Sequence, residues 1–267
     1  MTIKVYLDAV SVIGPGADNW EAWRAILQNP SRYEAARTRT PSINVLPPAE
    51  RRRIGAGVKL ALACGMDALA VTQTDPASIT TVFSSSGGDG ENCHMICEAL
   101  AGSDRLISPT RFHNSVHNAP SGYWGIASGA MLPSTSLCAY DASFAVGLLE
   151  AATQCFVEGR PVLYIAYDTP YPEPLHGVRP IADQFAVALL LHSAKTQHSM
   201  AALTLSLSNS PPSRMERTAL QNVCQNIPAA RSLPLLQAIA HLAEKAGEQV
   251  FLEYVNKRSL SIETSKA

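Results

Sequence analysis

Several stretches of this sequence are apolar on every side, and they constrain its fold more than any other feature. Residues 161–168 (PVLYIAYD) and 184–192 (QFAVALLLH) have the length of strands, while residues 142–149 (ASFAVGLL) begin a helix without a polar face. A strand or helix with no polar side has to be covered all round. Because strand-like and helix-like segments alternate along the chain, we predict a layered α/β domain in which helices cover a sheet.

The remaining elements follow from local patterns of apolar residues, glycine and proline. An alternating run at 3–14 predicts a strand that ends at a Gly-Pro-Gly turn, and Asp18 or Asn19 can cap the helix after it. Pro47 and Pro48 fit the first turn of a helix that continues to residue 71. The other predicted elements are a strand, glycine-rich turn and helix (78–102), helical turns and loops (108–134), a strand and a helix capped near Gly159 (134–159), a proline-rich loop (169–180), a strand (199–208), a helix (232–247) and two strand-like runs (249–255 and 259–264). We find no repeat and no linker, so we treat residues 1–267 as one domain.

The charge balance excludes some classes of function. With a formal net charge of -1 and 16% charged residues, the chain has no electrostatic basis for binding nucleic acid or an anionic membrane. The run QFAVALLLHSA is too short to cross a bilayer, and Asp8 interrupts the first apolar run, which argues against a signal peptide. Six irregularly spaced cysteines fit reduced thiols better than disulfides. We therefore expect a cytoplasmic protein without stable membrane insertion, and the low charge suggests a surface covered by a partner.

The junction of a strand and a buried helix at 134–152 (STSLCAYDASFAVGLLEAA) is a favoured place for a nucleophile. A side chain at the start of such a helix lies near unpaired N–H groups and the positive end of the helix dipole, which favours a thiolate. The residue in that position is Asp141, whereas Cys138 lies earlier, in the strand. An aspartate there can cap the helix but is a poor acyl acceptor. Two alternatives stay open: a carboxylate that assists decarboxylation, or one that mimics a bound acid.

Four motifs, in this order, resemble those of the β-ketoacyl synthases, which condense acyl chains held on an acyl carrier protein. They are LPPAERRRIGAGVKLAL, SSSGGDGEN, SPTRFHNSVHNAPSGYWGIASG and LPSTSLCAYDASFAVGLLEA, and the resemblance covers roughly residues 1–207. Aligned from the shared Pro133, the position of the family's catalytic cysteine falls on Asp141, and Cys138 comes too early. Nothing after Leu207 resembles the family's two histidine motifs. The resemblance therefore implies a thiolase-like fold truncated in its C-terminal half, with a shortened ending at 208–267.

A ketosynthase-like chain without the cysteine is similar to the chain length factors of type II polyketide synthases, and best matches the short ones of aryl polyene clusters. The resemblance implies a non-catalytic subunit that forms a heterodimer with an active ketosynthase and helps shape the cavity for the growing polyketide or polyene chain. It implies no cofactor of its own, because the substrate arrives on the phosphopantetheine of an acyl carrier protein. The alternative is a stand-alone acyltransferase or thioesterase that acts on carrier-bound acyl chains through Cys138 with His113 or His117, although no G-x-S-x-G motif supports it.

Candidate site residues follow from the resemblance and from charge. In the family, the region around 108–140 lies at the dimer interface and beside the acyl tunnel, and its strand pairs with the partner. The candidates for interface or tunnel are Phe112, His113, Val116, His117, Asn118, Tyr123, Trp124, Leu137, Cys138 and Tyr140. If Cys138 has no catalytic role, we expect a small buried thiol in a central strand. Three arginines at a helix start would oppose the helix dipole, so an acidic carrier protein is a candidate partner for Arg51, Arg52 and Arg53.

Two further motifs have plain structural interpretations. Cys93, His94 and Cys97 share one predicted helix but supply too few ligands for zinc, so we predict no metal site. SSSGGDGEN could bind phosphate before a helix. Because it lacks both GxGxxG and a P-loop lysine, we favour a tight structural turn.

Overall fold

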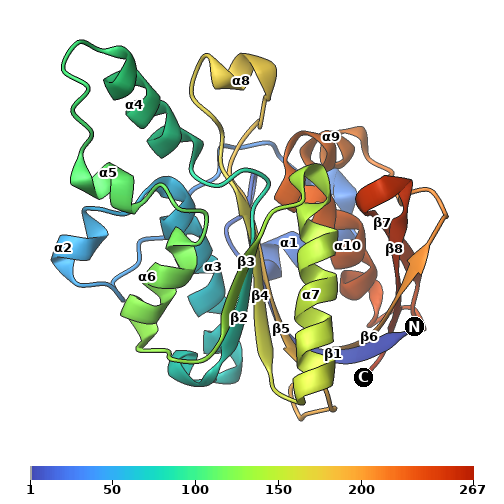
Figure 1. Ribbon diagram of the computed structural model, residues 1–267. Coiled ribbons are helices and arrows are strands. Elements are labelled where there is room, and N and C mark those ends of the chain that lie inside the picture. Colours follow the sequence, from blue (N-terminus) through green and yellow to red (C-terminus); the bar gives the residue numbers. More distant parts are fainter. Residues whose placement is uncertain (1) are drawn as a thin grey trace.

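The computed structural model describes residues 2–267 and contains one mixed sheet of eight strands (Figure 1). The strands are β1 (Ile3–Ile13), β2 (Thr80–Ser84), β3 (Ser134–Leu137), β4 (Val162–Asp168), β5 (Phe185–His192), β6 (Ala201–Ser208), β7 (Gln249–Glu253) and β8 (Ser259–Ser265). Their order across the sheet is β3-β2-β4-β5-β1-β6-β8-β7. β3, β2 and β4 run parallel, and all the other neighbouring pairs are antiparallel.

Helices cover both faces of this sheet, which confirms the predicted layered α/β fold (Figure 1). The helices are α1 (Trp20–Gln28), α2 (Pro48–Arg51), α3 (Ala56–Thr72), α4 (Gly90–Ala101), α5 (Pro109–His113), α6 (Ala119–Ser128), α7 (Ser143–Glu158), α8 (Leu175–Val178), α9 (Thr218–Asn226) and α10 (Leu233–His241). α3 and α6 share one hydrophobic core with the sheet, and α1, α7 and α10 share the other. The two cores lie on opposite faces of the strands.

The apolar runs of the sequence form the middle of the sheet. Every residue of β4 is buried, as are all residues of β5 except the last. Tyr164 of β4 faces α7, and its hydroxyl donates to the carbonyl oxygen of Phe144 at 2.7 Å. A Cβ at Gly147 would lie 2.5 Å from that hydroxyl oxygen, so only glycine lets α7 approach β4 this closely. α7 is thus fixed against the strands as a buried helix, as the sequence predicted.

The C-terminal part completes the second core. After β6, the chain forms α9, a 3₁₀ turn (Pro228–Ser232, η4), α10, β7 and β8. α10 lies against α1, where the Gln28 side-chain amide donates to the carbonyl oxygen of Ala240 at 2.9 Å. The predicted order of helix, strand and strand is confirmed, but the helix ends at His241 and α9 was not predicted.

The segment 47–71 differs from the single predicted helix. α2 ends at Arg51 and α3 begins at Ala56, because Ile54 turns into the core and Gly55 is extended. Arg51 therefore lies in the last turn of α2, where a cation is favourable to the helix dipole. The prediction that these arginines oppose a dipole at a helix start is wrong.

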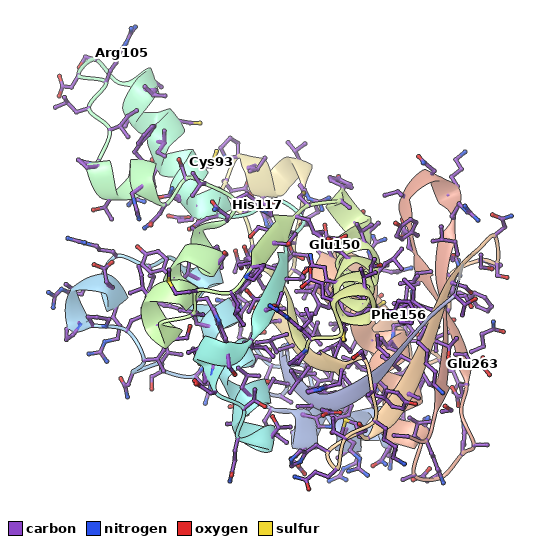
Figure 2. The ribbon with its side chains drawn as sticks, turned by 60° about the horizontal axis from the view of Figure 1, so that its bottom comes forward. Cys93, Arg105, His117, Glu150, Phe156 and Glu263 are labelled. Atoms are coloured by element: carbon purple, nitrogen blue, oxygen red, sulfur yellow. The ribbon has the colours of Figure 1, made fainter. Side chains whose placement is uncertain are left out.

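α4 and α5 extend away from the sheet as an arm, with Arg105 near its tip (Figures 1 and 2). Of the twelve residues of α4, only Gly90 and Asn92 are buried. A helix that buries so little of itself is stabilised by few contacts within its own chain. No helix within residues 2–267 is long and apolar enough to span a bilayer.

Candidate functional site

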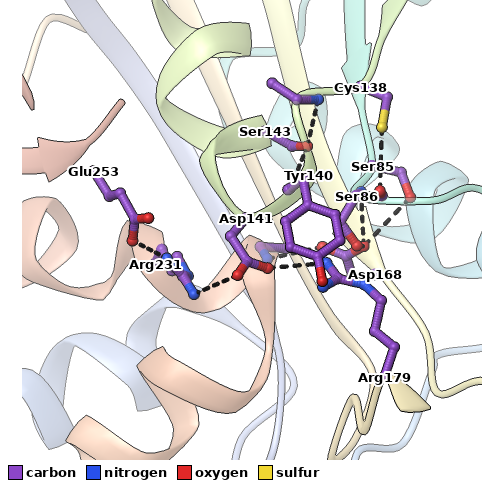
Figure 3. Close-up of polar contacts among 12 residues, drawn as sticks. Ser85, Ser86, Cys138, Tyr140, Asp141, Ser143, Asp168, Arg179, Arg231 and Glu253 are labelled. Carbon is purple, nitrogen blue, oxygen red and sulfur yellow. Dashed lines mark hydrogen bonds and ion pairs between the residues drawn. The ribbon is translucent and has the colours of Figure 1, made fainter. Parts of the chain in front are cut away.

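The parallel strands β2, β3 and β4 end at the same edge of the sheet, and the residues after them come together there (Figure 3). Ser85 and Ser86 follow β2, Cys138 follows β3, and Asp168 ends β4. Ligands of α/β sheets usually bind outside the carboxyl ends of the strands. We therefore take this edge as the candidate site.

Asp168 is the buried acceptor that organises the edge. Its carboxylate accepts from the Ser86 backbone N–H at 2.9 Å, from the Ser86 hydroxyl at 2.6 Å and from the Ala229 N–H at 2.8 Å. Burial raises the pKa of Asp168 from 3.8 to about 6, although these hydrogen bonds and Arg179 oppose the rise. Because Ala229 belongs to η4, Asp168 connects the turn after β2 to the C-terminal part of the chain.

Asp141 does not cap α7, contrary to the role that we predicted for it. One carboxylate oxygen lies 2.9 Å from Nη2 of Arg179, and the other lies 3.0 Å from Nη2 of Arg231 (Figure 3). Asp141 lies in a 3₁₀ turn (Tyr140–Ala142, η3), α7 starts after Ala142, and no side chain caps it. The carboxylate is thus neutralised by two cations and has no part in satisfying the helix N–H groups.

Arg179 comes from the loop after α8 and is held on several sides. Its guanidinium carbon lies 3.6 Å from the ring centroid of Tyr140, a cation–π contact. Burial opposes its charge, but hydrogen bonding to Asp141 and the charge of that carboxylate raise the pKa of Arg179. Tyr140 has a φ of 54°, so the strained left-handed residue of this turn directly precedes Asp141.

Arg231 comes from η4 and pairs with a second carboxylate, Glu253 at the end of β7 (Figure 3). The side chains of Asp141, Arg179 and Arg231 are 29%, 17% and 21% exposed, so water only partly screens these charges. The cluster therefore joins three segments that lie far apart in the sequence: the turn before α7, the loop after α8, and η4.

Tyr171 explains the glycine-rich turn SSSGGDG. Its ring is 8% exposed and lies directly on this turn. A Cβ at Gly87 would lie 1.8 Å from its hydroxyl oxygen, and a Cβ at Gly90 would lie 2.0 Å from its Cδ1. The Ser85 hydroxyl accepts from the Gly88 N–H at 3.1 Å. The glycines thus provide room for Tyr171, which supports the interpretation of this motif as a structural turn.

Cys138 is exposed, and it follows an edge strand. The prediction of a buried thiol in a central strand is therefore wrong. Its Sγ donates to the carbonyl oxygen of Ser86 at 3.1 Å. Across the described residues, no hydrogen bond joins this thiol to His113 or His117. His117 instead packs near Gly88, and its Nε2 is buried without a partner.

The interface candidates divide into two groups. Most are accessible: Phe112 is 68% exposed, Val116 53% and Tyr140 60%, His113, Asn118 and Cys138 are exposed, and His117 and Leu137 are half-buried. Tyr123 and Trp124 are 2% and 1% exposed and face the core beneath α6, where Trp124 packs edge-on against Phe83. These two residues are core residues of this chain, and their assignment to the interface or tunnel stays a prediction.

Arg52 and Arg53 line a cleft of about 440 Å³ between α3 and the arm, together with Arg111, Asp89 and Glu91. Arg53 also forms an ion pair with Glu50 at 3.0 Å, and Arg51 lies 2.5 Å from Asn44 Oδ1. Within residues 2–267, no group of three or more His, Cys, Asp or Glu side chains is placed to hold a metal ion.

Four important residues were not predicted: Asp168, Tyr171, Arg179 and Arg231. Asp168 had a detectable signal, because a carboxylate at the end of an entirely apolar strand is rarely without a function or a set of donors. Tyr171 and Arg179 lie in a proline-rich loop, and Arg231 lies in a 3₁₀ turn. Their partners are distant in the sequence, so no local pattern reveals them.

Comparisons with known proteins agree with this geometry. The sequence matches the model of the β-ketoacyl synthase N-terminal domain over residues 20–251. A search of curated proteins found no match. A chain from the ketosynthase of Xenorhabdus doucetiae in complex with its chain length factor is 25% identical, with a TM-score of 0.73, and the match covers 99% of this chain and 100% of that chain.

Two other solved structures share the fold at lower identity. One is a type II polyketide synthase carrier protein in complex with its ketosynthase bound to the hexaketide (11% identity, TM-score 0.78, 100% of both chains). The other is the ishigamide ketosynthase/chain length factor (11% identity, TM-score 0.72, 99% of both chains). The architecture is therefore the thiolase-like fold of ketosynthases. Because the family model also spans most of the sequence, this chain belongs to the β-ketoacyl synthase N-terminal domain family.

Proposed function

We propose that this chain is a non-catalytic subunit of the chain length factor type, which pairs with an active ketosynthase and helps to shape the cavity for the growing polyketide or aryl polyene chain. The observation that carries the proposal is the state of position 141. A condensing enzyme needs a free nucleophile at this helix start, but Asp141 is held by Arg179 and Arg231. Position 141 therefore carries no group that could accept an acyl chain.

The sheet edge at β3 supports pairing with another chain. β3 is an edge strand: among the described strands it pairs only with β2, and its other side faces no strand. An open strand edge offers unpaired N–H and C=O groups to a partner strand. In the proposed heterodimer, β3 pairs with the equivalent strand of the ketosynthase.

Exposed apolar side chains are concentrated in the part of the sequence that contains β3. Of the sixteen large apolar side chains that are exposed in the described part of the chain, eleven lie between residues 100 and 178. They are Leu100, Leu106, Phe112, Val116, Ile126, Met131, Tyr140, Phe156, Val157, Leu175 and Val178. Such side chains are typical of the core of a protein interface. We propose that the ketosynthase covers them.

The substrate would be presented on the phosphopantetheine of an acyl carrier protein, so the proposed subunit needs no cofactor of its own. The cleft lined by Arg52, Arg53 and Arg111 is the proposed contact for that acidic carrier. A cytoplasmic location accords with this role and stays a prediction.

The proposal is tested by coexpression with each ketosynthase encoded beside this chain, with a tag on one subunit. We expect a one-to-one complex in size-exclusion chromatography with light scattering. Leu137→Asp places a carboxylate in the paired strand, where burial without a partner costs about 3–5 kcal/mol, or roughly 10²–10⁴-fold in affinity. Phe112→Ala should keep the complex and change the length of its products.

Leu207→Asp is the matched control, because Leu207 is a 42% exposed leucine on β6, far along the sheet from β3. This variant should copurify with the ketosynthase as the unchanged chain does. If the unchanged chain stays a monomer beside every encoded ketosynthase, or if Leu137→Asp leaves the complex intact, the proposal is wrong.

A second candidate function is the stand-alone acyltransferase or thioesterase, which the exposure of Cys138 favours. A catalytic thiol would react quickly with iodoacetamide and would form an acyl-enzyme with a carrier-bound substrate. We expect slow labelling and no acyl-enzyme, because no imidazole hydrogen-bonds to this thiol in the described structure. Turnover by the isolated chain that is abolished by Cys138→Ala would favour the second candidate instead.

A further inference from the structure

We infer that Arg179 and Arg231 form a binding site for a small carboxylate, and that Asp141 permanently occupies this site as a built-in ligand. The inference concerns the chain's own site and does not depend on the proposed ketosynthase partner. It develops the possibility that an acid at this position mimics a bound one. The ligand class is a carboxylate of one or two carbons, the size of the group that Asp141 places there.

The geometry is that of a carboxylate shared between two cations. Each oxygen of Asp141 takes one guanidinium nitrogen, at 2.9 Å from Arg179 and 3.0 Å from Arg231 (Figure 3). Guanidinium groups bind carboxylates with directed, charge-assisted hydrogen bonds. With all three side chains less than a third exposed, the pairs are partly shielded from water rather than fully exposed.

Both arginines are positioned by contacts that do not involve Asp141. Arg179 lies on the ring of Tyr140, and Arg231 pairs with Glu253. The backbone of η4 next to Arg231 is fixed by the bond from the Ala229 N–H to Asp168 at 2.8 Å. The two guanidinium groups should therefore keep their places when the Asp141 carboxylate is removed, and leave a preformed site.

Occupation of this site also closes the edge of the sheet. The loop 169–182 carries Tyr171, which packs on the glycine turn, and Arg179, which is bound by Asp141. The loop is thus attached at two points over Ser85, Ser86 and Asp168. Without a carboxylate between the arginines, we expect this second attachment of the loop to be lost, while each guanidinium group keeps its other contact.

The test is chemical rescue of Asp141→Ala in the full chain, with sodium formate as the probe. Formate has the size of the deleted carboxylate. In sodium chloride, the variant should have a Tm several degrees lower than that of the unchanged chain. Relative to the unchanged chain, its hydrogen exchange should be faster in 169–182 and the same in the adjacent β5. Formate at the same ionic strength should restore both, with saturation in the millimolar range. Acetate should act more weakly, and pivalate should not act.

Two controls separate site binding from a general salt effect. The unchanged chain holds its own carboxylate, and Asp141→Asn fills the same space with an amide, so formate should leave the Tm of both unchanged. An equal rise in Tm in all three proteins, or no rise in Asp141→Ala, would overturn the inference.

If Asp141→Ala does not fold in chloride, the measurement is refolding. The yield of folded protein in formate is compared with the yield in chloride. A higher yield in formate supports the inference, and equal yields overturn it. Asp141→Asn gives an independent check, because the loss of charge should speed exchange in 169–182 while β5 stays protected. Unchanged exchange in this loop would contradict the role of Asp141 as its attachment.

Discussion

Replacing Gly90 with alanine should loosen the loop 169–182 and destabilise the chain. The new Cβ would lie 2.0 Å from Cδ1 and 2.6 Å from Cε1 of Tyr171, well inside the distance that carbon atoms tolerate. The ring is 8% exposed, so it cannot swing freely into solvent. Either the ring moves and pulls on the loop, or the start of α4 moves away from the sheet.

The magnitude follows from the geometry. Forcing an extra methyl group into a packed region costs about 1–3 kcal/mol. The contact at Gly90 is severe, so we expect the upper end, about 3 kcal/mol. Alanine favours a helix over glycine by at most about 1 kcal/mol, which leaves a net loss of about 2 kcal/mol. A chain of this length loses about 2–4 °C of Tm per kcal/mol, so Tm should fall by about 4–8 °C.

Thermal unfolding gives the loss of stability, and hydrogen exchange shows where it arises. Gly122→Ala is the matched control, because Gly122 also lies in a helix and its Cβ would meet nothing within 4 Å. That variant should keep or raise the Tm. In a Tyr171→Ala background, Gly90→Ala should cost nothing further. If Gly90→Ala behaves as Gly122→Ala does, or if its cost persists without the Tyr171 ring, the docking of this loop is wrongly described.

Further predictions concern the charged residues of the site. Burial raises the pKa of Asp168 from 3.8 to about 6, so its contribution to stability is complete below about pH 4 and is lost as the pH rises through 6. At 1.36 kcal/mol per pKa unit, the loss is about 3 kcal/mol. Urea unfolding from pH 4 to pH 7.5 should show it as a pH-dependent difference in unfolding free energy between the unchanged chain and Asp168→Asn. A difference that does not vary with pH would contradict this prediction. Asp141→Cys should form no carbon–carbon bonds alone, because the thiol would lack the histidines that polarise a thioester. Product analysis by mass spectrometry tests this, and condensation without a partner would show that the C-terminal part is misread. Finally, Arg231→Met should lower the Tm more than Arg217→Met. It leaves Glu253 without a cation and Asp141 with Arg179 alone, whereas Arg217 donates to the backbone carbonyl oxygens of Pro30 and Tyr33.

The sheet and its buried helices were predictable because runs of apolar residues in the sequence indicate which segments are buried. β4 and β5 are apolar throughout, and a strand of this kind fits only the covered middle of a sheet. α7 is apolar in the same way. β3 is different, since its four residues, Ser-Thr-Ser-Leu, do not indicate whether the strand lies at the centre or the edge. The error about Cys138 arose there.

The site itself was only partly predictable. The sequence singled out the junction before α7, and in the structure Asp141 of this junction pairs with Arg179 and Arg231. The role of Asp141 was wrong because a capping prediction considers only the nearest backbone N–H groups. Because of the 3₁₀ turn, α7 begins at Ser143, two residues after Asp141. The Ser143 hydroxyl accepts from the Ala139 N–H at 2.9 Å, within the turn. Arg179 and Arg231 reach Asp141 only through the tertiary fold.

The pairing of Asp141 with two arginines and the open edge of β3 have a common consequence. A carboxylate shared between Arg179 and Arg231 is a poor nucleophile, because both of its oxygens are already bound to cations. In the proposed function, this pairing closes the position that corresponds to the nucleophile of an active ketosynthase. The unsatisfied groups of this chain lie elsewhere, at the open edge of β3 and on the exposed apolar side chains between α4 and α8. In such a protein, the polar groups of the site are paired within the chain, while the strand edge and the apolar surface are not covered. It is therefore suited to act through a chain that it binds. Removing the Asp141 carboxylate should therefore disturb the closed loop, while a charge in β3 should disturb assembly, and the two effects should be separable.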